Sequence, residues 1–324
     1  MICSLEDVLA GDRDLLTHAA TSTDCPTLRD CTASQIINVA RDQGIEFATA
    51  LLYDRVLRSP ENGTFFQQVN ASRRAIVGNP PLVGIIPGAF YLEHKNTGAD
   101  GSQLAVILES INCRVELVPV DSFGSLAKNA AIIAEWLTRH RQERVALISL
   151  SKGSADVKIA LGLPSAAELF RNVDVWVSVS GLPQGTPLVA WLRRQFLRRF
   201  GVRLLLRLRG QRYSVVEELR QEPGGPLKIW PSVPAHLRVI HILSFPLRRH
   251  LANPWAARAF DRVAPLGPND GGGFLLSDAA NLPGTVFPVW GADHYLQPTW
   301  DVTVLLRRIF VESLSPRADL HQAT

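Results

Sequence analysis

After residue 75, short apolar segments alternate with amphipathic segments along most of the chain. The apolar segments are rich in Val, Ile and Leu, which is typical of buried strands, and the segments between them have the spacing of helices. Strands are expected at 82–88, 114–120, 144–150, 174–181, 237–243 and 285–291, and helices near 101–111, 124–140, 153–162, 251–262 and 301–314. This alternation predicts an α/β fold with a mostly parallel sheet and helices on both faces.

Two parts of the chain depart from this alternation. Residues 1–75 have apolar side chains at mixed spacings of three and four, which predicts an N-terminal helical arm. Residues 182–231 interrupt the alternation within the α/β domain of residues 76–324 and are expected to form an inserted cap.

The expected cap is rich in arginine. Val189, Leu192, Phe196 and Phe200 recur at helical spacing, and the arginines lie largely off that stripe. Between residues 175 and 216 there are eight arginines and no acidic residue. An apolar inner face of this cap is expected to shape a substrate pocket, while its arginines face solvent, an anionic substrate group or anionic lipid.

The composition indicates a globular protein. The chain has 324 residues, of which 46% are hydrophobic and 20% charged, and its net charge is +4. No apolar run is long enough to span a bilayer, and acidic residues follow the first methionine, so a cytoplasmic location is expected. The cysteines lack zinc-site spacing and are expected to be reduced thiols: Cys3, Cys25, Cys31 and Cys113.

The segment "VALISLSKGSADVKIAL" places Ser151 between an expected strand and an expected helix. A turn tight enough to push the hydroxyl outward needs small residues two positions away, and these are Ser149 and Gly153. The helix start behind the hydroxyl favours developing negative charge. Ser151 is therefore a candidate nucleophile, although a serine that only caps the helix fits the same pattern.

A serine nucleophile needs a base and an acid that orients the base. His294, in "GADHYL", follows the last expected strand, and Asp270, in the glycine-rich loop "GPNDGGG", follows the expected strand and helix at 237–262. The chain order Ser151, Asp270, His294 is the order of nucleophile, acid and base expected on such a sheet.

An oxyanion intermediate needs two N–H donors. The amide of Lys152, directly after Ser151, is one candidate. The loop after the first expected strand offers Gly88, Ala89 and Phe90, of which Ala89 is the preferred donor.

In "SLSKG", "GPNDGG", "GADHYL" and "PGAF", the chain resembles the lipase and esterase-like branch of the α/β-hydrolase superfamily over residues 82–314. The resemblance implies a Ser-His-Asp triad that hydrolyses an ester, thioester or amide through an acyl-enzyme without a cofactor or metal. Two positions depart from the pattern: Ser149 stands where the elbow usually has glycine, and Pro87 where histidine usually precedes Gly88. The first antiparallel strands of that family are not evident before residue 76.

Other assignments of the same chemistry fit the sequence less well. Asp293 with His321 is a second acid and base pair, but His321 lies in a polar tail beyond the last expected helix; Asp278 is a weaker alternative acid. Ser149 and Lys152 match an S-x-x-K motif, but the serine falls inside a strand and no companion motif follows.

A carboxylic ester with an apolar acyl group is the expected substrate, and a thioester of CoA or a carrier protein is the alternative. An inactive scaffold that binds a ligand or partner also fits the sequence. Contact with an anionic membrane or an acyl carrier is expected through the cap, whereas nucleic-acid binding is not expected, because the cap arginines are not interleaved with aromatic residues.

Overall fold

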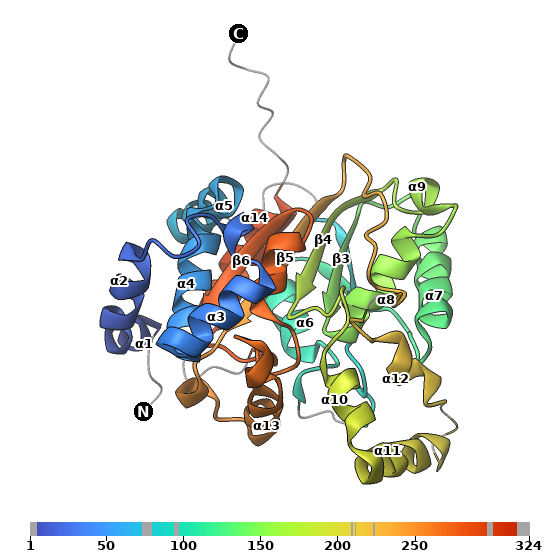
Figure 1. Ribbon diagram of the computed structural model, residues 1–324. Helices are drawn as coiled ribbons and strands as arrows, with labels where there is room; N and C mark the ends of the chain where they lie inside the picture. Colours follow the sequence, from blue (N-terminus) through green and yellow to red (C-terminus); the bar gives the residue numbers. More distant parts are fainter. Residues whose placement is uncertain are drawn as a thin grey trace.

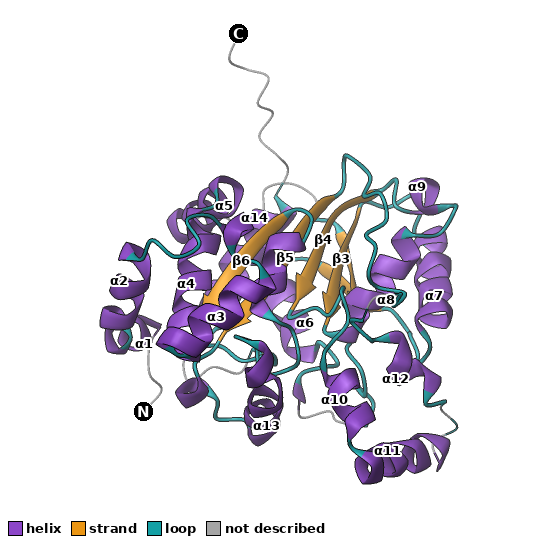
Figure 2. Ribbon diagram, in the orientation of Figure 1, coloured by secondary structure: helices purple, strands orange, loops and turns teal. Residues whose placement is uncertain are grey.

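The computed structural model describes residues 5–72, 80–93, 97–208, 210, 212–222, 224–296 and 301–315, and its centre is one sheet (Figures 1 and 2). The strands are β1 (Leu82–Ile86), β2 (Arg114–Leu117), β3 (Val145–Leu150), β4 (Val173–Val179), β5 (Arg238–Phe245) and β6 (Thr285–Trp290). Their order is β2-β1-β3-β4-β5-β6, and all neighbours are parallel. The predicted parallel sheet is confirmed. The largest difference is at β2, which ends before Pro119, a residue with no N–H for the strand ladder.

Helices precede, separate and follow the strands. The N-terminal ones are α1 (Leu5–Gly11), α2 (Arg13–Thr21), η1 (Leu28–Asp30), α3 (Ala33–Gln43), α4 (Ile45–Arg58) and α5 (Pro60–Ala71). Those between and after the strands are α6 (Ser102–Glu109), α7 (Leu126–Arg139), α8 (Lys152–Leu161), α9 (Ala166–Leu169), α13 (Pro254–Val263) and α14 (Thr303–Leu314). Short 3₁₀ turns are η3 (Arg248–His250), η4 (Ala264–Leu266) and η5 (Leu276–Asn281).

Both faces of the sheet are covered. In β3, Ala146 and Ile148 face a core shared with α5, α6 and α14, whereas Val145 and Leu147 face a core shared with α7 and α8. Because side chains alternate along a strand, this division requires apolar residues at every position, which explains the continuous apolar runs in the sequence.

The N-terminal helices pack on the β5–β6 half of the sheet. Helix α4 covers the face of that half opposite α5, and no strand occurs among residues 5–72. The side chain of Asn62 on α5 accepts a hydrogen bond of 2.8 Å from the amide of Val286 in the edge strand β6. Pro288, two residues further along the same edge, has no N–H to donate.

The insertion of residues 182–231 contains α10 (Leu188–Arg194), α11 (Phe196–Leu208) and α12 (Ser214–Glu218). The expected apolar stripe does not form one inward face, because the chain leaves the helical conformation at Gln195. Val189 on α10 is buried, but Phe196 and Phe200 on α11 are exposed to solvent. This part of the sequence prediction is therefore wrong about which way the stripe faces.

The structure bears on two expectations from the composition: that no segment spans a membrane, and that the cysteines are reduced thiols. Across the described ranges, no helix combines the length and apolarity needed to cross a bilayer. Cys25, Cys31 and Cys113 are buried free thiols, and Cys3 lies outside the described residues.

Candidate active site

Ser151 lies in a strained turn between β3 and α8. Its φ of 47° and ψ of −117° are rarely adopted by a residue with a side chain. The turn is held from both sides: the Ser151 amide donates to the carbonyl of Val179 on β4, and its carbonyl accepts from the amides of Ser154 and Leu182. Ordered neighbours thus maintain a backbone geometry that presents the Ser151 hydroxyl at the end of the strand.

Gly153 and Ser149, the small residues two positions from Ser151, lie in different surroundings. A Cβ at Gly153 would lie 2.6 Å from the carbonyl oxygen of Ile86 and 2.7 Å from that of Pro87. Ser149 is fully buried; its hydroxyl accepts from the indole N–H of Trp176 at 2.7 Å and is hydrogen-bonded to Ser154. Serine therefore fits where related turns have glycine, because its hydroxyl is bonded inside the core.

We expect Gly153→Ala to lower the free energy of unfolding by about 1–3 kcal/mol, because the new methyl group must push α8 away from the end of β1. Urea unfolding measures the change. Gly201→Ala is the matched control, because nothing lies within 4 Å of a Cβ at this helical position. Equal stabilities of the wild type and Gly153→Ala would show that the turn has room for a side chain.

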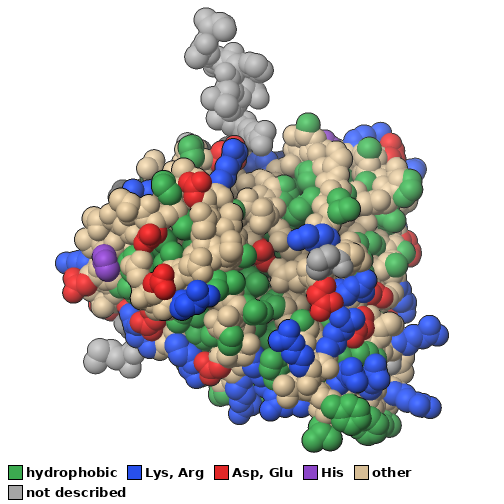
Figure 3. Space-filling view, in the orientation of Figure 1, with side chains coloured by type: hydrophobic (Ala, Val, Ile, Leu, Met, Phe, Trp, Pro, Cys, Tyr) green, Lys and Arg blue, Asp and Glu red, His purple; other side chains and the backbone are tan. Residues whose placement is uncertain are grey.

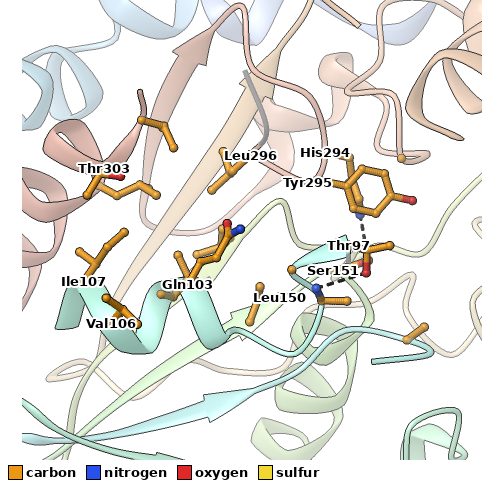
Figure 4. A pocket seen from close by; sticks show the side chains of 18 of the residues that line it. Thr97, Gln103, Val106, Ile107, Leu150, Ser151, His294, Tyr295, Leu296 and Thr303 are labelled. Carbon is orange, nitrogen blue, oxygen red and sulfur yellow. Dashed lines mark hydrogen bonds between the residues drawn. The ribbon is translucent and has the colours of Figure 1, made fainter. Parts of the chain in front are cut away.

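The structure brings Ser151, His294 and Asp270 together, although they come from three separate loops. Figure 4 shows the contact between His294 and Ser151. His294 Nε2 lies 2.9 Å from Ser151 Oγ, and His294 Nδ1 lies 2.6 Å from Asp270 Oδ2. Asp270 is 1% exposed and His294 7% exposed. With the proton of the imidazole on Nδ1 and directed at Asp270, Nε2 is free to accept the serine proton.

The loop around Asp270 fixes both partners. Asp270 Oδ1 accepts hydrogen bonds from the amides of Gly272 and Phe274, at 2.8 and 3.0 Å, and the Asp270 carbonyl accepts from the amide of His294. A Cβ at Gly272 would lie 1.9 Å from Cγ of the imidazole. The glycine run is evident in the sequence, but only the structure shows that Gly272 leaves space for the ring.

The electrostatics of His294 favour the protonated ring. Burial alone lowers the pKa of His294, but the negative charge of Asp270, its hydrogen bond and the charge of Asp293 together raise the pKa above its ordinary value. A buried imidazolium is therefore stabilised in this site.

The alternative acids have other contacts. Asp293 Oδ1 accepts from the amide of Tyr295, and its backbone carbonyl accepts from Ser244. Asp278 binds the side chain of Gln221, and burial raises the pKa of its carboxyl to about 6. His321 lies outside the described residues. The imidazole of His294 thus bonds to Asp270 and to neither alternative.

The S-x-x-K reading conflicts with the position of the lysine. Lys152 Nζ is buried and donates to both carboxylate oxygens of Asp156, at 2.7 and 3.0 Å, and Asn129 donates to the same carboxylate. Burial raises the pKa of Asp156, against the opposing effects of Lys152 and Asn129. The ammonium is thus held away from Ser149, whose hydroxyl lies in the serine network.

Of the three residues in the loop after β1, the contacts favour Ala89 as an N–H donor. The amide of Gly88 donates to the carbonyl of Ala99, and the amide of Phe90 donates to that of Ser122. The Ala89 amide donates to no partner within the described ranges. Lys152 begins α8, where the first amides have no partner inside the helix.

A cavity of about 560 Å³ opens at Ser151 (Figure 4). Its walls come mainly from α6, α14 and the loops that carry Ala89 and His294. The larger apolar side chains in the lining are Phe90, Leu104, Val106, Ile107, Leu150, Val179, Leu296, Val302 and Leu306. Sequence reasoning missed α6 and α14 as walls of the cavity.

The expected contribution of the cap to the cavity is wrong for the described residues. None of the residues of 182–231 that are described lines it. Leu206 and Val215 of the cap instead pack with Phe123 against Ala89 and Phe90. The cap thus supports the loop after β1 from outside. Elsewhere in the described part of the chain, no group of His, Cys, Asp and Glu side chains is arranged to hold a metal ion.

Neither a protein-family model nor a curated protein matches the sequence. Among solved structures, the metagenomic carboxyl esterase MGS0156 is similar over 94% of this chain and 98% of its own, with 15% identity and a TM-score of 0.52. The lipase BlEst2 of Bacillus licheniformis, in its propeptide form, is similar over 69% of this chain and 49% of its own, with 16% identity and a TM-score of 0.50. Together with the parallel sheet and its helices, these similarities show that the chain has the α/β-hydrolase fold.

Proposed function

We propose that the protein is a serine hydrolase that cleaves a carboxylic ester with an apolar acyl group through an acyl-enzyme. The observation that carries the proposal is the unbroken series of hydrogen bonds from Ser151 through His294 to Asp270, at the mouth of a largely apolar cavity. A carboxyl esterase and a lipase among proteins of the same fold support the ester as substrate class.

In the acylation step, Ser151 Oγ attacks the ester carbonyl carbon while its proton passes to His294 Nε2. The carbonyl oxygen becomes an oxyanion, for which the amides of Ala89 and Lys152 are the proposed donors. When the intermediate collapses, the bond to the leaving oxygen breaks and the proton on Nε2 passes to that oxygen. The alcohol leaves, and the acyl group stays on Ser151.

In the deacylation step, a water molecule takes the place of the alcohol. His294 Nε2 accepts a proton from this water as its oxygen attacks the acyl carbon, and then returns the proton to Ser151 Oγ as the acid leaves. Asp270 stays ionised and stabilises the imidazolium in both steps. These residues complete the reaction without a cofactor.

A fluorophosphonate probe tests this function. We expect intact-mass measurement to show one probe adduct on the wild type, peptide mapping to place it on Ser151, and Ser151→Ala to remain unlabelled. A folded wild-type protein that gains no adduct would contradict the hydrolase and favour an inactive scaffold. Rates on nitrophenyl esters and acyl-CoA of matched chain length then separate esterase from thioesterase.

We expect activity to fall as the pH is lowered through the pKa of His294, because only the neutral ring accepts the serine proton. Since Asp270 raises this pKa, the midpoint of the kcat/KM profile should lie above about 6.5, with a plateau at higher pH. In Asp270→Asn, the negative charge that opposes the effect of burial on the pKa of His294 is lost. The midpoint should therefore move to lower pH, and kcat should drop about 10⁴-fold. An unshifted midpoint would exclude Asp270 as the partner of the base.

A further inference from the structure

Helix α11 presents a large apolar face to solvent. Leu206 is buried and Val202 partly buried, so this side of the helix contacts the rest of the protein. The exposed apolar residues are Phe196, Leu197, Phe200, Leu204, Leu205 and Leu208, which are 45% to 82% exposed. At about 100° per residue, Leu204 and Leu197 lie opposite the side that is packed. The centre of the apolar face therefore points directly away from the protein.

Arginines border this face. Helix α11 contains Arg198, Arg199, Arg203 and Arg207 and no acidic residue. On the helical wheel, Arg198 lies at one margin of the exposed apolar face, and Arg203 and Arg207 lie at the other. In Figure 3, hydrophobic and basic side chains meet at the lower margin, where Figure 1 places α11.

A second group of arginines lies between α11 and α13. Arg198, Arg258 and Arg262 line a cavity of about 620 Å³ beside Trp191. The guanidinium groups of Arg198 and Arg262 lie 5.0 and 4.4 Å from the centre of the Trp191 ring. Two of the three guanidinium groups thus lie against one tryptophan ring, and that of Arg258 lies 5.6 Å from the centre of the Trp255 ring.

Within the described ranges, none of these three arginines forms a salt bridge. Asp261 also lines this cavity, and its carboxylate is bound by Arg248. Burial and the charges of Arg198 and Arg258 lower the pKa of Arg262. An anion in the cavity would relieve this repulsion, and a phosphate group matches the donor geometry of guanidinium groups.

We propose that α11 and the arginine-lined cavity form a docking surface for membranes that contain anionic lipid. The apolar face of α11 enters the boundary between headgroups and acyl chains, and the arginines bind lipid phosphates. Trp255, which is 63% exposed on α13 and lies beside Arg258, suits the same interface. In a symmetric pair of chains the arginine margins would face each other, which disfavours a second copy as the occupant.

Co-sedimentation with vesicles tests the proposal independently of hydrolysis, because the full chain is used as Ser151→Ala and leaves the lipid intact. We expect binding to phosphatidylcholine vesicles with about 30% phosphatidylglycerol to exceed binding to pure phosphatidylcholine at least tenfold and to weaken with salt. Adding Phe200→Glu should weaken binding at least tenfold. The triple change R198Q, R258Q and R262Q should weaken it about a hundredfold, near fivefold per arginine.

Two matched variants control for loss of apolar area or charge elsewhere. Ile229→Glu changes a residue near α8 that is 82% exposed. Arg171→Gln removes a charge from an exposed ion pair with Glu168. Both variants, made in the Ser151→Ala chain, should bind vesicles as that chain does. Circular dichroism checks that all variants fold. Equal binding to both vesicle types, or wild-type binding by Phe200→Glu, would overturn the proposal. A dimer that Phe200→Glu dissociates, without vesicle binding, would overturn it in favour of a second copy.

Discussion

Replacing Ser151 with alanine is expected to lower kcat for ester hydrolysis by about 10⁶-fold, to a rate set by the remaining donors and binding contacts. The physical reason is the loss of Ser151 Oγ. Among the described residues, it is the only atom that lies both at the mouth of the cavity and within hydrogen-bonding distance of His294 Nε2. Neighbouring hydroxyls do not replace it, because Ser149 and Ser154 are buried and bonded to each other. Steady-state kinetics on a nitrophenyl ester measure the loss.

Stability should separate this loss from unfolding. The strained backbone at residue 151 is retained in alanine, so the melting temperature should stay close to that of the wild type. Ser165→Ala, an exposed serine whose side chain makes no capping bond, is the control and should keep full activity. Hydrolysis by Ser151→Ala at a rate near that of the wild type would show that another group is the nucleophile.

Gly272→Ala should lower kcat by about 10⁴-fold or more, even though residue 272 takes no part in the proton transfers. Its methyl group would lie 1.9 Å from the imidazole of His294, so the ring must move and lose its bonds of 2.6 and 2.9 Å to Asp270 and Ser151. Displacing the base removes the activation of the serine. Probe labelling of Ser151 should slow in parallel.

Gly272 does not adopt a positive φ, so alanine is compatible with its backbone and the effect should be on the ring. The control is Gly11→Ala, where a Cβ has no neighbour within 4 Å and activity should be unchanged. In a crystal structure of Gly272→Ala, we expect a changed rotamer of His294. Full activity with an undisplaced ring would contradict the prediction.

The sheet was predictable because five of its strands, all except the edge strand β2, are buried along nearly their whole length and are therefore rich in apolar residues, as β3 illustrates. Ser151, Asp270 and His294 were predictable as a group because parallel strands bring their carboxyl ends to one edge. Their proximity agrees with the sequence analysis, and their catalytic roles stay predictions.

Other features depend on contacts between distant segments. The cavity joins Val106 on α6 to Thr303 on α14, and no local pattern links two positions so far apart in the chain. Similarly, periodicity identified the apolar stripe through Phe196 and Phe200 but not the direction it faces. That direction follows from the break at Gln195, which turns α11 relative to α10.

The edge of β6 explains why the first helices belong to the folded unit. A free strand edge can recruit a strand from another chain and so lead to aggregation or exchange of segments between molecules. Here Asn62 occupies the outward amide of Val286, and Pro288 offers no donor at the next outward position. The N-terminal helices therefore help to cover a strand edge that could otherwise pair with a strand of another molecule.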